Sequence, residues 1–203
     1  IMKVTISNIG WQSENDAEMY AFLKKKKCTG IEIAPTRIFP ENPYSDLKTV
    51  ANFRDKLQSE YSLKVVSMQS ICFGMNEAIF SSEEERNSLL EYIKQSIDFA
   101  SELNCTNLVF GSPKNRNINT NQEEIAVAYF SEIGKYATEK NTVFAIEPNP
   151  GIYGTNFINT TNEALDFVKA CNVEGLKVNF DLGTVIYNEE SLAVLENNLK
   201  WIN

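Results

Sequence analysis

Short apolar runs alternate with amphipathic stretches along almost the whole chain, and this alternation restricts the fold more than any other feature. The six apolar runs are residues 2–7, 30–34, 63–70, 106–113, 142–148 and 176–181. Helices are predicted at residues 14–27, 46–61, 81–104, 123–140, 161–171 and 189–199. Strands that are apolar on both faces and separated by helices are typical of a parallel sheet. The pattern therefore predicts an α/β fold built from repeated strand–helix units.

Two architectures fit such repeats: an open doubly wound sheet and a TIM (β/α)8-type barrel. The open sheet predicts a glycine-rich phosphate loop after an early strand, but residues 6–13 read ISNIGWQS and match neither nucleotide-binding pattern. The barrel predicts polar groups at the C-terminal tips of many strands. Such groups lie at or near the C-terminal ends of all six runs: Asn8, Glu32, Gln69, Lys114 with Arg116, Glu147 and Asp181. The barrel is therefore the favoured fold.

Length limits how much of a barrel the chain can form. Eight units at this spacing need roughly 250 to 280 residues, whereas the chain has 203 and supplies about six units. We therefore expect residues 1–203 to form a single barrel domain that is incomplete at its C-terminus. Open barrel edges favour pairing with another chain, so association into a homo-oligomer is expected.

Charge and composition exclude several classes of function. The net charge is −8, and the one basic cluster, residues 24–27, closes a predicted helix, so binding to nucleic acid is not expected. No run of about 18 apolar residues occurs, so no membrane partner is expected. The four cysteines form no C-x-x-C pair and indicate buried free thiols in a reducing, cytoplasmic compartment. The chain contains no histidine, which excludes histidine-dependent triads within it.

Two acids end two successive apolar runs. Glu147 closes VFAIE and Asp181 closes LKVNFD. A buried carboxylate is costly unless it is paired or bound to a metal, and a divalent cation shared by neighbouring strands compensates both acids at once. The alternative is that each acid faces water or pairs with Lys114 or Arg116. Because the two acids occupy matching strand ends, the metal hypothesis is favoured.

The other strand-end residues suit a polar substrate. Glu32 lies between two isoleucines that should face the helices, so its carboxylate should face the lumen and accept a substrate hydroxyl, or else form a structural salt bridge. Lys114 and Arg116 lie in the loop after the fourth run, where they could meet a phosphate or carboxylate or simply be solvated. Aromatic side chains after strand ends, Tyr153 among them, could cover the apolar face of a sugar or could be plain packing.

Four segments carry a family resemblance: GIEIAPT at 30–36, FGSPKNR at 110–116, IEPNPGIYGTNF at 146–157 and VNFDLGT at 178–184. With them the whole chain resembles the xylose isomerase-like TIM barrel superfamily, the sugar phosphate isomerase/epimerase group. The resemblance implies a divalent ion, manganese, magnesium, zinc or cobalt, held by ligands from strands five to eight. Glu147 and Asp181 match the first two ligands, while the histidine and glutamate of strands seven and eight have no counterpart in this chain. Thr184 stands where family members often have a substrate-binding histidine.

The resemblance also implies the chemistry. Glu147 would move a proton next to a carbonyl while the metal stabilises an enediolate, and the sugar would be positioned by Glu32, Gln69, Lys114, Arg116, Asn149 and Thr184. The predicted function is a metal-dependent isomerase or epimerase of a small sugar, sugar phosphate or keto-acid. Two alternatives stay open: an inositol-pathway-type dehydratase on the same barrel, and a catalytically silent sugar-binding protein.

Overall fold

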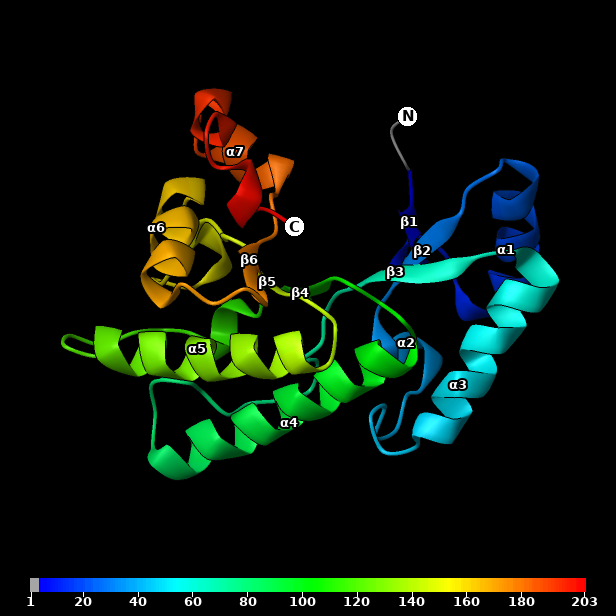
Figure 1. Ribbon diagram of the computed structural model, residues 1–203, viewed down its shortest axis with the longest axis horizontal. Helices are drawn as coiled ribbons and strands as arrows, with labels where there is room; N and C mark the ends of the chain where they lie inside the picture. Colours follow the sequence, from blue (N-terminus) through cyan, green and yellow to red (C-terminus); the bar gives the residue numbers. More distant parts are fainter. Residues whose placement is uncertain (1–3) are drawn as a thin grey trace.

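Six parallel strands form one sheet in the computed structural model, which describes residues 4–203 (Figure 1). The strands are β1 (Ile6–Ser7), β2 (Gly30–Ile33), β3 (Lys64–Met68), β4 (Leu108–Phe110), β5 (Phe144–Ile146) and β6 (Leu176–Val178). Each strand pairs in parallel with the next one along the chain. The predicted α/β fold is confirmed, with strands shorter than the apolar runs; residues 2 and 3 of the first run lie outside the described residues.

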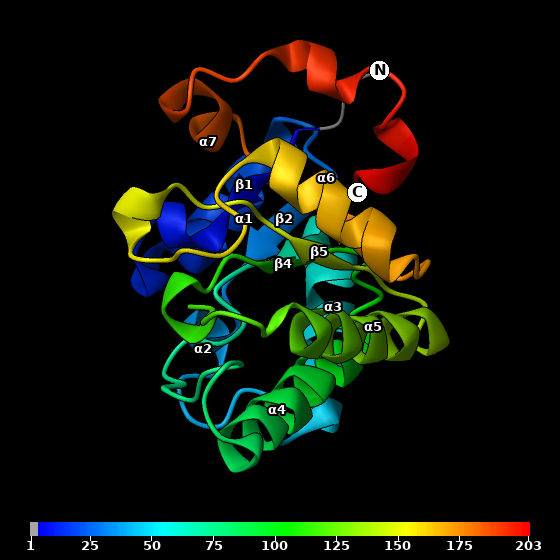
Figure 2. The ribbon, with the colours of Figure 1, turned by 90° about the vertical axis from the view of Figure 1, so that its left-hand side faces the viewer.

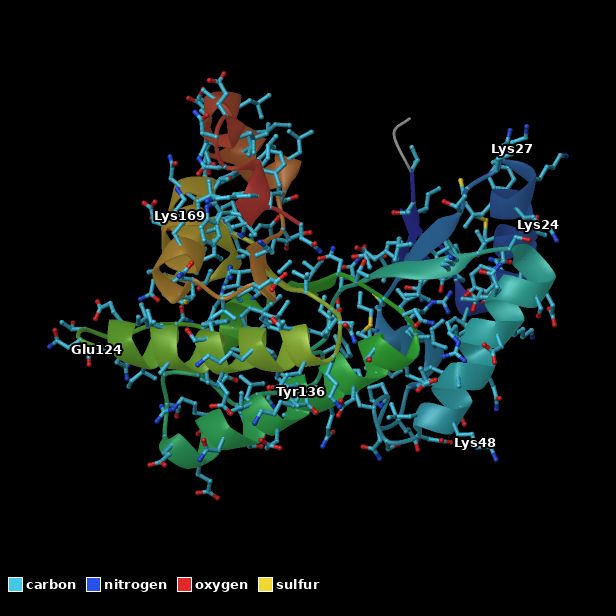
Figure 3. All side chains as sticks on the ribbon, in the orientation of Figure 1. Lys24, Lys27, Lys48, Glu124, Tyr136 and Lys169 are labelled. Atoms are coloured by element: carbon cyan, nitrogen blue, oxygen red, sulfur yellow. The ribbon has the colours of Figure 1, made fainter. Side chains whose placement is uncertain are left out.

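The helices lie on the outer side of this sheet, as expected for a barrel (Figures 1 and 2). They are α1 (Asp16–Lys25), α2 (Pro35–Ile38), α3 (Leu47–Lys56), α4 (Glu83–Glu102), α5 (Glu123–Glu139), α6 (Thr161–Cys171) and α7 (Leu182–Tyr187). Side-chain caps begin several of them: Ser82 Oγ accepts from the backbone of Glu85, and Thr160 and Glu163 form a capping box. Figure 3 shows Lys24 and Lys27 at the outer end of α1, away from the sheet.

Aromatic packing fixes the central strands against the helices. Phe110 of β4 and Phe144 of β5 have ring centroids 5.3 Å apart, and Phe130 of α5 packs edge-on against Phe110 at 5.5 Å. All three rings are fully buried. Edge-to-face aromatic pairs contribute beyond their buried area, so this cluster holds the ends of β4 and β5 in a fixed position. These two strands carry much of the site described below.

The helix predicted at residues 189–199 is wrong. The chain forms α7 earlier, directly after Asp181, and then two short 3-10 turns at Leu192–Leu195 and Leu199–Trp201. Glu189 and Asn197 adopt left-handed backbone conformations, with φ of 54° and 66°, which interrupt any continuous helix across this range. The apolar residues that suggested a helix are instead divided between separate turns.

The described residues form a partial barrel. Ile202 makes an isolated parallel bridge with Val178, and the Asn203 amide donates to the Val178 carbonyl at 3.0 Å, so a seventh strand position begins beside β6. Within residues 4–203, β1 and β6 are not paired with each other. No helix in this part of the chain combines the length and the apolar character that crossing a bilayer requires.

The contact between α5 and the start of β6 gives a test of this packing. A Cβ at Gly175 would collide with the Gly134 carbonyl oxygen and lie 2.6 Å from Thr138 Oγ1, whereas a Cβ at Gly151 would meet nothing within 4 Å. We expect Gly175→Ala to lower the free energy of unfolding by about 1–3 kcal/mol and Gly151→Ala to change it by less than about 0.5 kcal/mol. Urea denaturation measures both; equal effects would contradict the close packing of α5 on β6.

Candidate metal and substrate site

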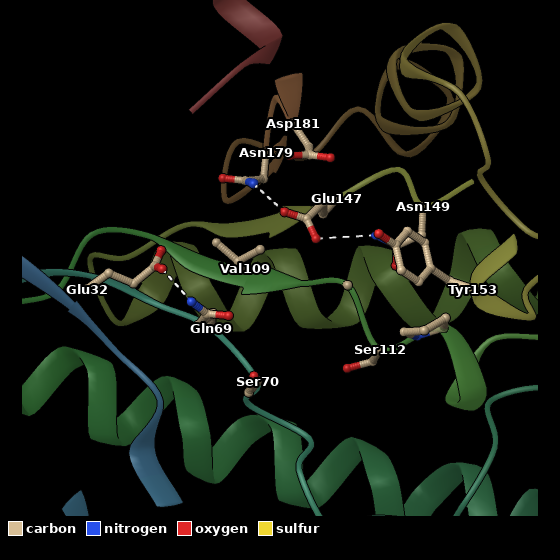
Figure 4. Close-up of a pocket in the computed structure, with 12 residues that line it drawn as sticks. Glu32, Gln69, Ser70, Val109, Ser112, Glu147, Asn149, Tyr153, Asn179 and Asp181 are labelled. Atoms are coloured by element: carbon tan, nitrogen blue, oxygen red, sulfur yellow. Dashed lines mark hydrogen bonds between the residues drawn. The ribbon is translucent and has the colours of Figure 1, made fainter. Parts of the chain in front are cut away.

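A cavity of about 410 Å³ lies where the strands end, and polar side chains form most of its wall (Figure 4). The C-terminal ends of parallel strands meet at one end of a barrel, which is why side chains that follow β2 to β6 reach the same space. The lining residues are Glu32, Gln69, Ser70, Val109, Gly111, Ser112, Pro113, Glu147, Asn149, Tyr153, Asn179 and Asp181.

Glu147 and Asp181 both lie in this wall, and their neighbours hold each carboxylate in a set orientation. Glu147 Oε1 accepts from Asn179 Nδ2 at 2.9 Å, and Glu147 Oε2 accepts from Asn149 Nδ2 at 3.3 Å. Asp181 caps α7: Oδ1 accepts from the Gly183 amide at 3.3 Å and Oδ2 from the Thr184 amide at 2.7 Å. Neither carboxylate forms an ion pair within residues 4–203.

Burial and the nearby Asp181 charge raise the pKa of Glu147 above its ordinary value. The amide hydrogen bonds from Asn149 and Asn179 and the charge of Arg116 act in the opposite direction. The Glu147 carboxylate is therefore poorly solvated and lies near a second anion, with no cation in contact among the described residues. A positive charge bound beside Glu147 and Asp181 would offset the desolvation of Glu147 and the repulsion between the two carboxylates.

The donor atoms present suit half of a metal site. Carboxylate oxygens are the ligands that divalent cations such as Mg²⁺ and Mn²⁺ prefer. The buried Oδ1 of Asn149 has no hydrogen-bond partner in the described structure, and a Cβ at Gly111 would lie 3.4 Å from it and 3.0 Å from Glu147 Oε2. Glycine at position 111 therefore leaves space beside both oxygens. Among residues 4–203, no third acidic, cysteine or histidine side chain joins Glu147 and Asp181 to complete a cluster.

Glu32 lies on the opposite side of the cavity and is held by neutral donors. Its carboxylate accepts from Ser67 Oγ at 2.8 Å and from Gln69 Nε2 at 2.6 Å, and Gln69 Nε2 also lies 2.8 Å from Ser7 Oγ. The side chain points into the lumen, as the two flanking isoleucines predict. The structural salt bridge considered for Glu32 does not form in the described part of the chain. The hydrogen bonds that the Glu32 carboxylate accepts leave it able to accept another from a ligand hydroxyl.

Three of the predicted substrate contacts lie outside the cavity wall. Lys114 is exposed, and its Nζ donates to Asn76 Oδ1 at 3.3 Å. Arg116 is fully buried, with its guanidinium 6.0 Å from the Phe110 ring centroid. The buried Thr184 Oγ1 lies 2.7 Å from Asp181 Oδ2 and 2.9 Å from the Pro148 carbonyl oxygen. The hydroxyl therefore contacts the Asp181 carboxylate and does not reach the cavity.

Arg116 lies against the loop at Ile158 instead of lining the cavity. Its Nη2 lies 3.5 Å from the Ile158 carbonyl oxygen, and its Nε and Nη1 have no partner in the described structure. Burial lowers its pKa to about 10, so the side chain stays charged at neutral pH, and the attraction to Glu147 partly offsets that burial.

Several lining residues were missed from the sequence. Asn179 orients the Glu147 carboxylate, and Ser70 and Ser112 place hydroxyl groups in the wall from left-handed backbone conformations with φ of 54° and 34°. Left-handed serines are uncommon and cluster at functional sites. For Asn179, the sequence signal that could have indicated its place in the wall was its position at a strand end, two residues before Asp181.

Comparisons with known proteins agree with this architecture. The sequence model described as "Xylose isomerase-like TIM barrel" matches residues 20–202. No curated protein sequence matches the chain.

Three solved structures illustrate the structural similarity. A D-psicose 3-epimerase with D-tagatose from Clostridium cellulolyticum H10 is 17% identical with a TM-score of 0.79, covering 100% of this chain and 71% of that one. A probable 3-DHS dehydratase, AsbF, from Bacillus anthracis is 16% identical with a TM-score of 0.75, with the same coverage. The IolI protein with a bound zinc atom is 16% identical with a TM-score of 0.72, covering 99% and 70%. At these identities the similarity establishes the fold alone.

The raised pKa of Glu147 predicts a pH-dependent cost to stability in metal-free protein. The folded state binds a proton at Glu147 more tightly than the unfolded state does, so the ionised carboxylate lowers the stability of the fold at neutral pH. This loss of stability disappears as the pH falls through the raised pKa toward 4.5, the ordinary value. In a chelator, Glu147→Gln should therefore gain stability relative to wild type at pH 7.5 and lose that advantage near pH 4.

Urea denaturation at the two pH values measures this difference. Glu84→Gln, which removes an exposed carboxylate on α4, is the matched control and should show a much smaller change. A Glu147→Gln effect that is the same at both pH values would contradict the buried, repelled carboxylate.

Proposed function

Because the chain belongs to the xylose isomerase-like TIM barrel family, we propose that it acts as a divalent-metal-dependent isomerase or epimerase on a small sugar. The observation that carries this proposal is the placement of Glu147 and Asp181 in the wall of one cavity at the carboxyl end of the sheet. The similarity to a D-psicose 3-epimerase supports the reaction class, and the zinc in the IolI structure supports a metal.

Glu147 and Asp181 would hold the ion, with manganese, magnesium, zinc and cobalt as candidates. When bound, a divalent ion polarises a carbonyl and stabilises negative charge on its oxygen. Glu147 is the residue we assign to proton transfer at the carbon next to that carbonyl. Its hydrogen bonds from Asn149 and Asn179 fix the direction in which the carboxylate points.

The remaining wall residues would bind the sugar itself. Glu32 accepts hydrogen bonds, and Gln69, Ser70 and Ser112 offer further polar groups at the other side of the cavity (Figure 4). Glu147 and Glu32 arise from different strands, so a sugar between them would be held from two sides. This arrangement provides the fixed orientation that proton abstraction at a single carbon requires.

Two other functions of the same cavity stay in competition, one catalytic and one not. The first is the inositol-pathway-type dehydratase considered from the sequence; the similarity to a probable 3-DHS dehydratase supports loss of water as the reaction, without indicating the substrate. The lack of a third acidic, cysteine or histidine ligand within residues 4–203 supports a sugar-binding protein without catalysis. Product analysis separates the three: an epimer, a dehydrated product or unchanged sugar.

We also propose a cytoplasmic location, supported by the four free cysteines in the described structure. Association into a homo-oligomer is supported by exposed apolar side chains at the two sides of the open sheet, Ile6 and Ile9 near β1 and Ile186 and Tyr187 on α7.

Solvent exchange tests the proposed reaction directly. Incubation of the protein in D₂O with Mn²⁺ and a panel of ketoses, including D-psicose and D-tagatose, should introduce deuterium at one carbon next to the carbonyl, detected by NMR. Glu147→Gln should lower this rate by at least about a hundredfold, since it removes the proton-transfer group. EDTA should abolish the exchange, whereas Glu84→Gln should leave it unchanged. Exchange that persists in Glu147→Gln would contradict the assignment of Glu147.

Tyr153 gives a second test, because it lines the cavity and the residue is 65% exposed. An aromatic ring in this place can cover the apolar face of a sugar. Tyr153→Ala should weaken sugar binding by about five- to tenfold, as loss of one stacking contact predicts, and Tyr153→Phe should retain it. Tyr187→Ala, which removes an exposed tyrosine outside the cavity, is the control. Equal sugar affinities of the wild type and the three variants would show that Tyr153 does not contact the sugar.

A further inference from the structure

The charges around the cavity restrict the substrate further, and this inference rests on the proposed function. We propose that the cavity binds an uncharged sugar and discriminates against the phosphorylated form of the same sugar. The sequence alone left sugar, sugar phosphate and keto-acid open, because Lys114 and Arg116 follow a strand end and were available to meet an anion.

The wall contains three carboxylates, from Glu32, Glu147 and Asp181. Within residues 4–203, no lysine or arginine lines the cavity with them. A phosphate monoester carries about 1.5 to 2 negative charges at neutral pH. One carboxylate at roughly 7 Å from such a group disfavours its binding by about four- to sevenfold even in water, and more in a cavity with a lower effective dielectric constant.

The two cationic side chains that follow the lining residues Ser112 and Pro113 in the sequence are directed away from the cavity. Lys114 extends to Asn76, in the segment after β3, and is exposed to solvent. Arg116 has no exposed surface and lies against the Phe110 ring and the Ile158 carbonyl oxygen. In this arrangement neither cation contributes to the cavity wall the charge-assisted hydrogen-bond donors by which proteins hold phosphate oxygens.

A divalent ion bound by Glu147 and Asp181 would cancel their two charges and leave Glu32 as the uncompensated carboxylate. Glu32 accepts from Ser67 and Gln69, which are neutral donors, so its negative charge stays. The other polar groups of the wall are amides and hydroxyls. They are suited to sugar hydroxyls, each of which can donate to a carboxylate or amide oxygen and accept from an amide N–H.

The test compares the affinity of this chain for D-fructose, D-tagatose and D-psicose with its affinity for their 6-phosphates. Titrations followed by NMR of ¹⁵N-labelled protein, with Mg²⁺ present, give a ratio of dissociation constants for each pair. For the best-bound sugar we expect the phosphate to bind at least about tenfold more weakly at low ionic strength. The ratio should fall as salt rises to about 0.5 M, because the repulsion is screened.

A charge variant identifies the source of the discrimination. Glu32→Gln keeps the size of the side chain and removes the uncompensated charge, so the ratio of the two dissociation constants, phosphate to free sugar, should narrow by at least about fourfold. Glu84→Gln removes the same charge from the surface of α4 and should leave the ratio unchanged. The salt dependence of the wild-type protein tests the same repulsion without any substitution.

Equal or tighter binding of a sugar phosphate, in wild type at low salt, would overturn the inference while leaving an isomerase or epimerase in place. A salt-independent ratio would also overturn it, since the discrimination would then be steric. The proposed function fails separately, in the deuterium exchange experiment, if no ketose exchanges a proton.

Discussion

The candidate site depends on the burial of the Glu147 carboxylate next to the like charge of Asp181, at the ends of neighbouring strands. Glu147 and Asp181 line the same cavity, and the charge of Asp181 contributes to the raised pKa of Glu147. A fold does not keep two uncompensated carboxylates together without a cost in stability. Amide donors, a helix N-terminus and a buried arginine reduce that cost, but none of them neutralises the pair by direct contact. This cost is the physical reason for the proposal that a cation binds beside the pair.

The residues around Glu147 and Asp181 hold the two carboxylates in different ways. Asp181 is held by the first turn of α7 and by Thr184, so its position follows from the local backbone. Glu147 is held by side chains, Asn149 from its own loop and Asn179 from the next strand end. The charge of the buried Arg116 attracts the Glu147 carboxylate without touching it, and its side chain lies against the loop at Ile158. Removal of any one of these supports would alter the orientation or the charge state of a carboxylate without removing a ligand.

Much of the fold and part of the site could be predicted from the sequence. The positions of Glu32, Glu147 and Asp181 in the wall follow from a simple rule, since an acid inside or at the end of an apolar run has to be directed toward a polar space. Lys114 and Arg116 could not be placed, because the 3-10 turn at Pro113–Asn115 sets the direction of each side chain and only tertiary packing fixes that turn. Asn179 was missed because a neutral amide at a strand end contradicts no burial rule. The helix expected at 189–199 failed because left-handed residues interrupt an otherwise helical pattern.

The most direct test of the account is the location of a bound metal. Crystals of the protein soaked in millimolar Mn²⁺ would be examined for anomalous scattering from manganese. The account predicts a peak between the carboxylates of Glu147 and Asp181, within coordination distance of at least one oxygen of each. Carboxylates that face separate spaces, with manganese bound elsewhere or at neither residue, would contradict it.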